Sequence, residues 1–302
     1  MQYALAPLAG VLITVMNAVN SRFSFAVGNL PSSLVVHLVG LTAACAVLAA
    51  RPERRGPERP PLYLYSGGIV GVGTIVCCNI AYGNMDMQLA VAFALLGQTV
   101  FAVFVDATGF LGRKKYPVGI GTLPGLALAL TGIAVISGSD FGTARYAPVA
   151  VLAGILPAFS FILNSRLAER IGIFRSTRAN YVTGLSATLV AAALSSFTDS
   201  ASPLRSPLVF LGGLIAAGPV LVLGGGLLGV IMIGTVNFAF PRLPALYATL
   251  LIFSGQALAG VALDSALGGS LDVRQLAGIV IVLAGLTLNA AVADTRARGP
   301  RS

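Results

Sequence analysis

The chain has 302 residues, of which 56% are hydrophobic and 10% are charged. Apolar stretches of about 20 residues recur along it, each long enough to cross the hydrocarbon core of a bilayer as a helix. This composition excludes an ordinary soluble domain and indicates an all-α, polytopic membrane protein. The net charge of +9 comes largely from arginines in short loops between apolar stretches, so it indicates membrane orientation and not nucleic-acid binding.

The apolar stretches predict ten transmembrane helices, five in each half of the chain. In chain order they cover residues 3–21, 33–50, 62–83, 89–109 and 118–137, then 146–165, 179–197, 220–240, 245–263 and 275–292. We therefore expect a first repeat over residues 1–141 and a second repeat over residues 142–302. Because each repeat has an odd number of helices, the second one would enter the membrane inverted.

The placement of arginine and lysine supports this inversion. With the N-terminus in the cytoplasm, 15 of the 19 basic residues fall on the cytoplasmic side, and the other side keeps Arg22, Arg145, Arg205 and Arg274. That bias follows the positive-inside rule and predicts that both termini face the cytoplasm. We expect a multi-pass protein of the cell's inner membrane, with the lipid bilayer around it and both repeats working in a single chain.

The two halves share sequence as well as helix number. Asn20-Ser21-Arg22 recurs 144 positions later as Asn164-Ser165-Arg166, and the GGIVG of residues 67–71 recurs 158 positions later as the GGLLG of residues 225–229. At the second offset three polar residues also recur, in the pairs Asn79 and Asn237, Gln98 and Gln256, and Asp106 and Asp264. Duplication in an apolar chain is typical of transporters that bind substrate between two repeats at mid-membrane.

The second copy is 14 residues longer between its second helix and its GGLLG segment, as the two offsets show. The extra sequence includes residues 208–218, which are apolar but cover only about half the length of a membrane span. Gly218 and Pro219 end this stretch and interrupt a helix. We expect it to lie at the membrane surface or to re-enter the membrane without crossing it.

One combination of motifs resembles a known family. A GGxxG segment is followed by a Pro-x-x-Pro loop, then by Gly-Gln, with an aspartate eight residues after the glutamine. This pattern resembles the YdcZ-type proteins of the drug/metabolite transporter superfamily, and the chain is similar to a fused pair of their five-helix units. The first half departs from the pattern, because residues 84–87 read Asn-Met-Asp-Met where the second half has the Pro241 to Pro244 loop. The resemblance implies a small-molecule transporter with alternating access.

Several amide side chains lie within the expected spans, where no water is present to bond them. Gln98 and Gln256 fall near the middle of their helices, and Asn79 and Asn237 fall toward helix ends. A role in substrate binding competes with an interhelical hydrogen bond for the glutamines, and with helix capping for the asparagines. Asn17, Asn20 and Asn164 extend the set of candidate substrate-binding residues, and Asn17 has no counterpart because Phe161 takes its place.

The titratable candidates are few. His37 is the only histidine, and the equivalent position of the second repeat holds Tyr181, so both are candidate substrate-binding residues. His37 is suited to proton relay, although an interfacial or packed histidine is the simpler interpretation. Asp106 and Asp264 are candidates for coupling to protons or another ion, but the basic residues after Asp106 favour an interfacial ion pair.

Transport of a small molecule is thus the leading function. The apolar parts of the first and sixth helices lack an acidic residue, which departs from the small multidrug resistance proteins, whose essential glutamate lies in the first helix. A non-transporting receptor or assembly factor, and a carrier of a lipid-linked molecule, remain alternatives. One histidine and few carboxylates offer little for catalysis, so we expect no enzyme, no cofactor and no metal site.

Overall fold

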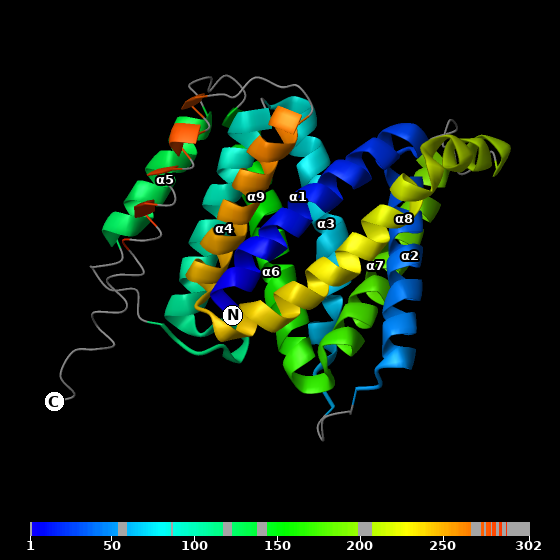
Figure 1. Cartoon of the computed structure of the whole chain (residues 1–302), viewed down its shortest axis with the longest axis horizontal. Helices are drawn as coiled ribbons and strands as arrows, with labels where there is room; N and C mark the ends of the chain where they lie inside the picture. Colours follow the sequence, from blue (N-terminus) through cyan, green and yellow to red (C-terminus); the bar gives the residue numbers. More distant parts are fainter. Residues whose placement is uncertain are drawn as a thin grey trace. The chain divides into compact units, whose positions relative to one another are not determined.

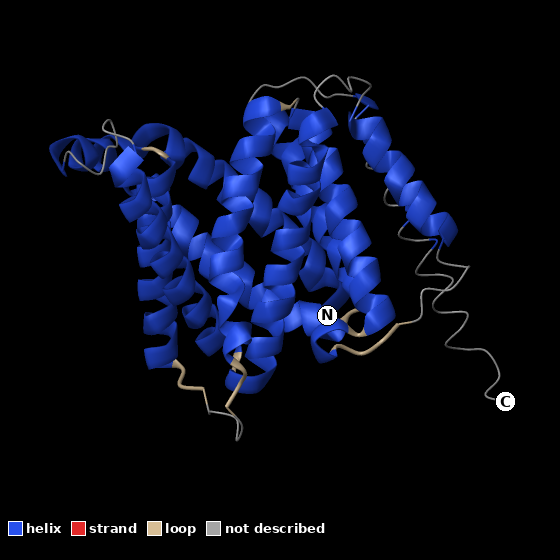
Figure 2. Cartoon of the chain, turned by 180° about the vertical axis from the view of Figure 1, so that it is seen from behind, coloured by secondary structure: helices blue, strands red, loops and turns tan. Residues whose placement is uncertain are grey.

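The computed structural model describes residues 2–53, 59–85, 87–116, 123–137, 144–198 and 207–266, with scattered residues between 273 and 288. In these stretches every regular element is a helix, as Figure 2 shows. The α-helices are α1 (Gln2–Val27), α2 (Asn29–Ala50), α3 (Gly67–Asn84), α4 (Met87–Thr108), α5 (Leu123–Ser137), α6 (Ala147–Ile171), α7 (Ile173–Thr198), α8 (Pro207–Ala239) and α9 (Ala245–Ala266). Four short 3₁₀ helices accompany them: η1 (Leu62–Ser66), η2 (Phe110–Gly112), η4 (Ala144–Tyr146) and η6 (Phe240–Arg242).

These helices agree with the prediction of an all-helical membrane protein. Among the described residues, six helical stretches are long and apolar enough to cross a membrane: Tyr3–Val27, Asn29–Ala50, Leu62–Ala81, Ala147–Ile171, Leu208–Arg242 and Ala245–Leu263. Phe93–Thr108 and Leu123–Gly132 are shorter apolar helices. The expected tenth helix falls on residues 275–292, where only scattered residues are described and these are helical. The count of ten spans therefore stays a prediction.

Two pairs of helices are joined more tightly than the sequence predicted. α1 continues to Val27 and α6 to Ile171, and a single glycine separates each from the next helix. Gly28 has a φ of 92° and Gly172 a φ of 99°, a backbone conformation that other residues adopt only with strain. The predicted ends at residues 21 and 165, and starts at 33 and 179, were wrong by several residues. They followed the apolar stretch, whereas a helix continues through polar residues until its backbone turns.

The chain divides into two compact units, each built from both halves of the sequence. Unit 1 contains residues 1–10, 73–158 and 242–302, and unit 2 contains residues 11–72 and 159–241. In unit 1, α4 packs against α5 and α9 around buried Leu95 and Phe253. In unit 2, α2 packs against α7 and α8 (Figure 1) around Ala44, Tyr181 and Val230.

The first part of α8 is the extra segment of residues 208–218. α8 bends at Gly218, which has a φ of 74°, and Pro219 follows. In Figure 1 the first turns of α8 point away from the rest of that helix. Leu208 is 83% exposed and Ile215 is 74% exposed, which suits contact with lipid. A helix of eleven residues is about 16 Å long, about half the thickness of a bilayer core. That this segment does not cross the membrane stays a prediction.

Candidate functional site

In unit 1 the helices meet at glycines that leave no room for a side chain. A Cβ at Gly10 would overlap the carbonyl oxygen of Ile252, and a Cβ at Gly154 would overlap that of Ala94. Gly97 lies in the same way on Val151 and Gly255 on Pro7. At the repeat offsets of 144 and 158, the contact of Gly10 with Ile252 corresponds to that of Gly154 with Ala94. The contact of Gly255 with Pro7 corresponds in the same way to that of Gly97 with Val151. Unit 1 therefore holds these helix contacts in two equivalent copies, each joining one half of the sequence to the other.

In unit 2, glycines likewise leave no room for a side chain where α2 and α7 cross. A side chain at Gly40 would overlap the ring of Tyr181, and one at Gly184 would overlap the ring of His37. His37 and Tyr181 are themselves equivalent positions, and their rings meet edge to face with centroids 6.0 Å apart. Two predicted site residues are thus brought together by glycines that allow close helix approach.

His37 is held by hydrogen bonds on one side of its ring. Its Nδ1 lies 2.8 Å from the carbonyl oxygen of Ser33, which only accepts, so Nδ1 donates. The hydroxyl of Ser33 in turn lies 3.2 Å from that of Thr188 on α7. In the neutral ring this bonding leaves Nε2, beside Gly184, as an acceptor. Tyr181 differs, because its hydroxyl donates to the carbonyl of Gly226 at 3.3 Å.

Asn164 lies at the centre of a buried polar cluster in unit 2. Its Nδ2 donates to Asn180 Oδ1 at 2.8 Å and to Ser160 Oγ at 3.2 Å. Ser160 donates onward to the carbonyl of Gly67 at 2.9 Å, and Ser176 donates to the Asn164 carbonyl at 2.6 Å. α6, α7 and the start of α3 are thereby tied together by side chains that the apolar pattern did not reveal, apart from Asn164.

The remaining asparagine candidates divide by burial. Asn17 and Asn79 are exposed, so neither is held in a described interior. Asn237 is 2% exposed, and its Nδ2 donates to Thr177 Oγ1 at a long 3.4 Å. Asn20 is half-buried, with its Oδ1 covered beside Gly225. The two members of the Asn79 and Asn237 pair therefore have different surroundings despite their equivalent positions.

The two glutamines belong to unit 1. Gln98 on α4 is 8% exposed, and no hydrogen bond joins its amide to another described residue. Gln256 on α9 is half-buried. A nearly buried amide without a partner among the described residues is in the environment expected of a group that binds a ligand or water. The glutamines lie in unit 1, whereas His37 and Tyr181 lie in unit 2.

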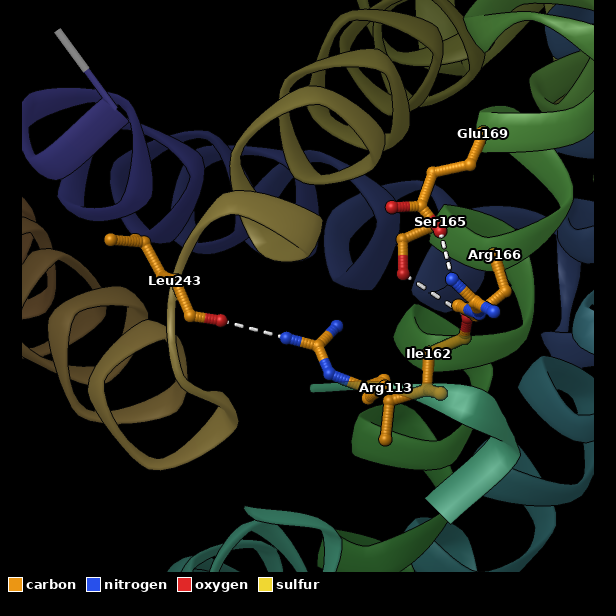
Figure 3. A network of polar contacts seen from close by, with 6 residues as sticks. All are labelled: Arg113, Ile162, Ser165, Arg166, Glu169 and Leu243. Carbon is orange, nitrogen blue, oxygen red and sulfur yellow. Dashed lines mark hydrogen bonds and ion pairs between the residues drawn. The ribbon is translucent and has the colours of Figure 1, made fainter. Parts of the chain in front are cut away.

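Asp106 has a role that the sequence did not predict. It is 3% exposed, and its carboxylate accepts the backbone N–H groups of Ala245 at 2.6 Å and Leu246 at 2.8 Å. Asp106 therefore caps the N-terminus of α9, 139 residues away in sequence. Nearby, the guanidinium of Arg113 donates to the carbonyl of Leu243 at 2.7 Å, as Figure 3 shows. The side chain of Asp264 lies outside the described residues.

Glu53 is a second carboxylate at a helix start, in unit 2, and sequence reasoning missed it. It accepts the N–H groups of Phe174 at 3.1 Å and Arg175 at 2.9 Å, while the Arg175 guanidinium donates to the Glu53 carbonyl at 2.8 Å. Its position in a loop between spans gave no signal. On α6, Figure 3 also shows Arg166 paired with Glu169 one turn later.

Comparison with known proteins agrees with this architecture. The family described as "Putative inner membrane exporter, YdcZ" matches residues 1–135 and residues 146–288. One solved crystal structure is similar over 97% of this chain and 98% of its own, with a TM-score of 0.71 and 16% identity, which shows the fold alone. No curated protein matches the chain. Since the family match covers two repeats and nearly the whole chain, the chain belongs to the YdcZ-type family of inner membrane exporters.

Proposed function

We propose that the chain transports a small molecule by alternating access between two inverted five-helix repeats. The observation that carries this proposal is the meeting of His37 with its own counterpart, Tyr181. A position can contact its counterpart only near the axis that relates the two copies. The α2 and α7 crossing would therefore lie beside that axis, where repeat-built transporters bind substrate.

The reciprocal glycine contacts support a two-fold relation. Gly10 with Ile252 and Gly154 with Ala94 exchange under the two repeat offsets, as expected for copies related by a two-fold axis. Reciprocity alone does not set the direction of the axis. The odd helix number and the bias of basic residues toward one side favour an axis in the membrane plane, with both termini in the cytoplasm.

A transport assay tests the proposal directly. Ligands would first be found by thermal stabilisation of the purified protein, because binding to the folded state raises its apparent stability. Each stabilising compound would then be tested in proteoliposomes, where we expect saturable uptake and accelerated exchange against the same compound inside. Ligands that bind but are never carried across would favour a receptor over a transporter.

His37→Phe provides the site-directed arm of this test. Phenylalanine preserves a ring beside Gly184 but removes the Nε2 acceptor, so we expect a folded protein with transport reduced about tenfold. Leu38→Ala is the matched control, since Leu38 is the next residue of α2 and is 55% exposed. Equal transport by His37→Phe and Leu38→Ala would remove His37 from the site.

A further inference from the structure

The two copies of the duplicated asparagine, Asn20 and Asn164, have different partners. Asn164 is 4% exposed, and its Nδ2 donates to Asn180 Oδ1 at 2.8 Å and to Ser160 Oγ at 3.2 Å. Its Oδ1 faces Gly67 at the start of α3. Ser160 already donates its own proton to Gly67, so it accepts from Asn164, and this fixes the orientation of the Asn164 amide.

Asn20 occupies the equivalent place without the equivalent partners. Its Oδ1 lies against Gly225, which corresponds to Gly67. The positions that correspond to Ser160 and Asn180 hold Met16 and Val36, neither of which accepts an ordinary hydrogen bond from an amide. Among the described residues the buried Oδ1 has no partner, and none bonds the Nδ2, which is not fully buried.

The shared geometry shows what is missing around Asn20. Its oxygen lies against a glycine, as does that of Asn164, and Val36, which stands where Asn180 supplies an oxygen in the second repeat, lies beside the same glycine. An amide in apolar surroundings without partners is less favourable than an apolar side chain of the same shape. Side chains that violate a folding rule in this way are expected at functional sites.

We propose that Asn20 is a substrate-binding residue that donates from Nδ2 to a carbonyl-type oxygen of the substrate, whereas Asn164 is structural. The ligand would supply the acceptor that Asn180 supplies in the second repeat. Met16 and Val36 flank the site with apolar side chains, so the ligand class is a neutral carbonyl compound with an apolar body. This inference rests on the proposed transport function and assigns the two copies of one residue to different tasks.

The first experiment needs no ligand. Asn20→Leu and Asn164→Leu are near-isosteric changes at equivalent positions, measured as melting temperatures of the purified protein. Asn164→Leu leaves Asn180 without its donor and should lower the melting temperature by about 2–4 °C or more. Asn20→Leu removes an amide that has no described partner, so this variant should have an unchanged or higher melting temperature. An equal fall in both variants would overturn the division of tasks.

A second variant leaves Asn20 in place and restores its missing partner. Val36→Asn puts an amide where Asn180 stands in the second repeat, so the new oxygen should accept from Asn20 Nδ2. We expect an unchanged or raised melting temperature and a ligand affinity lower by about tenfold or more. Val36→Ala is its control, because it changes the same position without offering an acceptor. Unimpaired binding by Val36→Asn would contradict the proposal.

The ligand class is tested with two probes of similar shape. N,N-dimethylbenzamide carries a carbonyl acceptor and no donor, whereas protonated N,N-dimethylbenzylamine carries a donor and no acceptor. We expect only the first to stabilise the wild-type protein, and Asn20→Leu to abolish that response. Equal stabilisation by both probes, or none by N,N-dimethylbenzamide, would overturn the ligand class.

The outcomes also separate this inference from the proposed transport. If the carbonyl probe binds through Asn20 but no bound compound crosses a liposome membrane, transport fails and the binding site stands. If compounds are transported and Asn20→Leu carries them with unchanged affinity, transport stands and the role of Asn20 is refuted.

Discussion

Asp106 and Glu53 illustrate how a carboxylate is accommodated in a largely apolar protein. Each accepts two backbone N–H groups at a helix start, Asp106 at α9 and Glu53 at α7. These N–H groups have no partner within their own helix, and the helix dipole favours a negative charge there. Both carboxylates therefore have a structural task, and any coupling role of Asp106 would have to coexist with its cap.

Asp106→Asn tests which task dominates. Asparagine retains only one acceptor oxygen, so we expect a loss of about 0.5–2 kcal/mol in the free energy of unfolding. If the cap is the whole role, the pH dependence of transport in liposomes will match that of the wild type. Glu169→Gln is the control, since it removes a partly exposed ion pair of small effect. A changed pH profile in Asp106→Asn alone would show that this carboxylate exchanges a proton.

Gln98 and Gln256 allow the original site hypothesis to be tested. A buried amide that serves a ligand should reduce binding when truncated and spare folding, whereas one that serves packing should reduce stability first. Because Gln98 has no described hydrogen-bond partner, we expect Gln98→Ala to weaken ligand binding about tenfold with little loss from hydrogen bonding. Two folded variants, Gln98→Ala and Gln256→Ala, with unchanged affinity and rate would exclude both glutamines from the site.

At the scale of elements, glycine decides how closely the helices approach. Gly255 lies against the carbonyl oxygen of Pro7 and Gly97 against that of Val151, both within unit 1. Contacts of this kind stabilise membrane helix pairs through close packing, because lipid provides no hydrophobic drive for helix association. The positions of these glycines therefore specify which helices pack together more closely than the apolar stripe of each helix does.

A pair of substitutions in α9 measures this effect. Gly255→Ala would place a methyl group on the Pro7 carbonyl, and we expect a loss of about 1–3 kcal/mol of stability. Gly260→Ala, five residues further along α9, meets open space and should gain up to about 1 kcal/mol from helix propensity. Equal melting temperatures for the two variants would show that the Gly255 contact is not formed in the membrane protein.

The bent start of α8 gives a prediction about a whole element. If residues 208–218 do not cross the membrane, cysteines at Leu208 and at Val220 lie on the same side. In a background without Cys45, Cys77 and Cys78, we expect an impermeant thiol reagent to label both sites from outside the cell only. Labelling from opposite sides would make this segment an additional span and would change the orientation of everything after it.

At the scale of the whole molecule, the distribution of basic residues predicts the orientation. We expect Ser302→Cys to react with an impermeant reagent only after the membrane is permeabilised, and Thr143→Cys, between the expected fifth and sixth helices, to react in intact cells. Both sites lie in loops or tails of the predicted topology, so neither should disturb packing. A C-terminal cysteine that reacts from outside would contradict the inverted five-plus-five arrangement.

The sequence by itself determined the class of protein, most helices and the duplication. Apolar length is sufficient for the class and the helices, because in a membrane each backbone polar group must be satisfied within its own helix. The duplication followed from residues that recur at fixed offsets. The match of the YdcZ-type family to two segments confirmed the resemblance read from the GGxxG and Gly-Gln motifs. Helix ends were less accurate, since Gly28 and Gly172 set them through backbone conformation and not through hydropathy.

Only the tertiary structure decided which partners the polar residues have. Because Asn20 and Asn164 are equivalent in sequence, the sequence predicted the same role for both. For His37 it left a choice between proton relay and packing. Their partners come from distant segments: Asn180 for Asn164, Thr188 for Ser33 beside His37, and the start of α9 for Asp106. A side chain's chemistry depends on which neighbours satisfy its hydrogen bonds, and in a helical membrane protein those neighbours lie on other helices, beyond the reach of any local pattern.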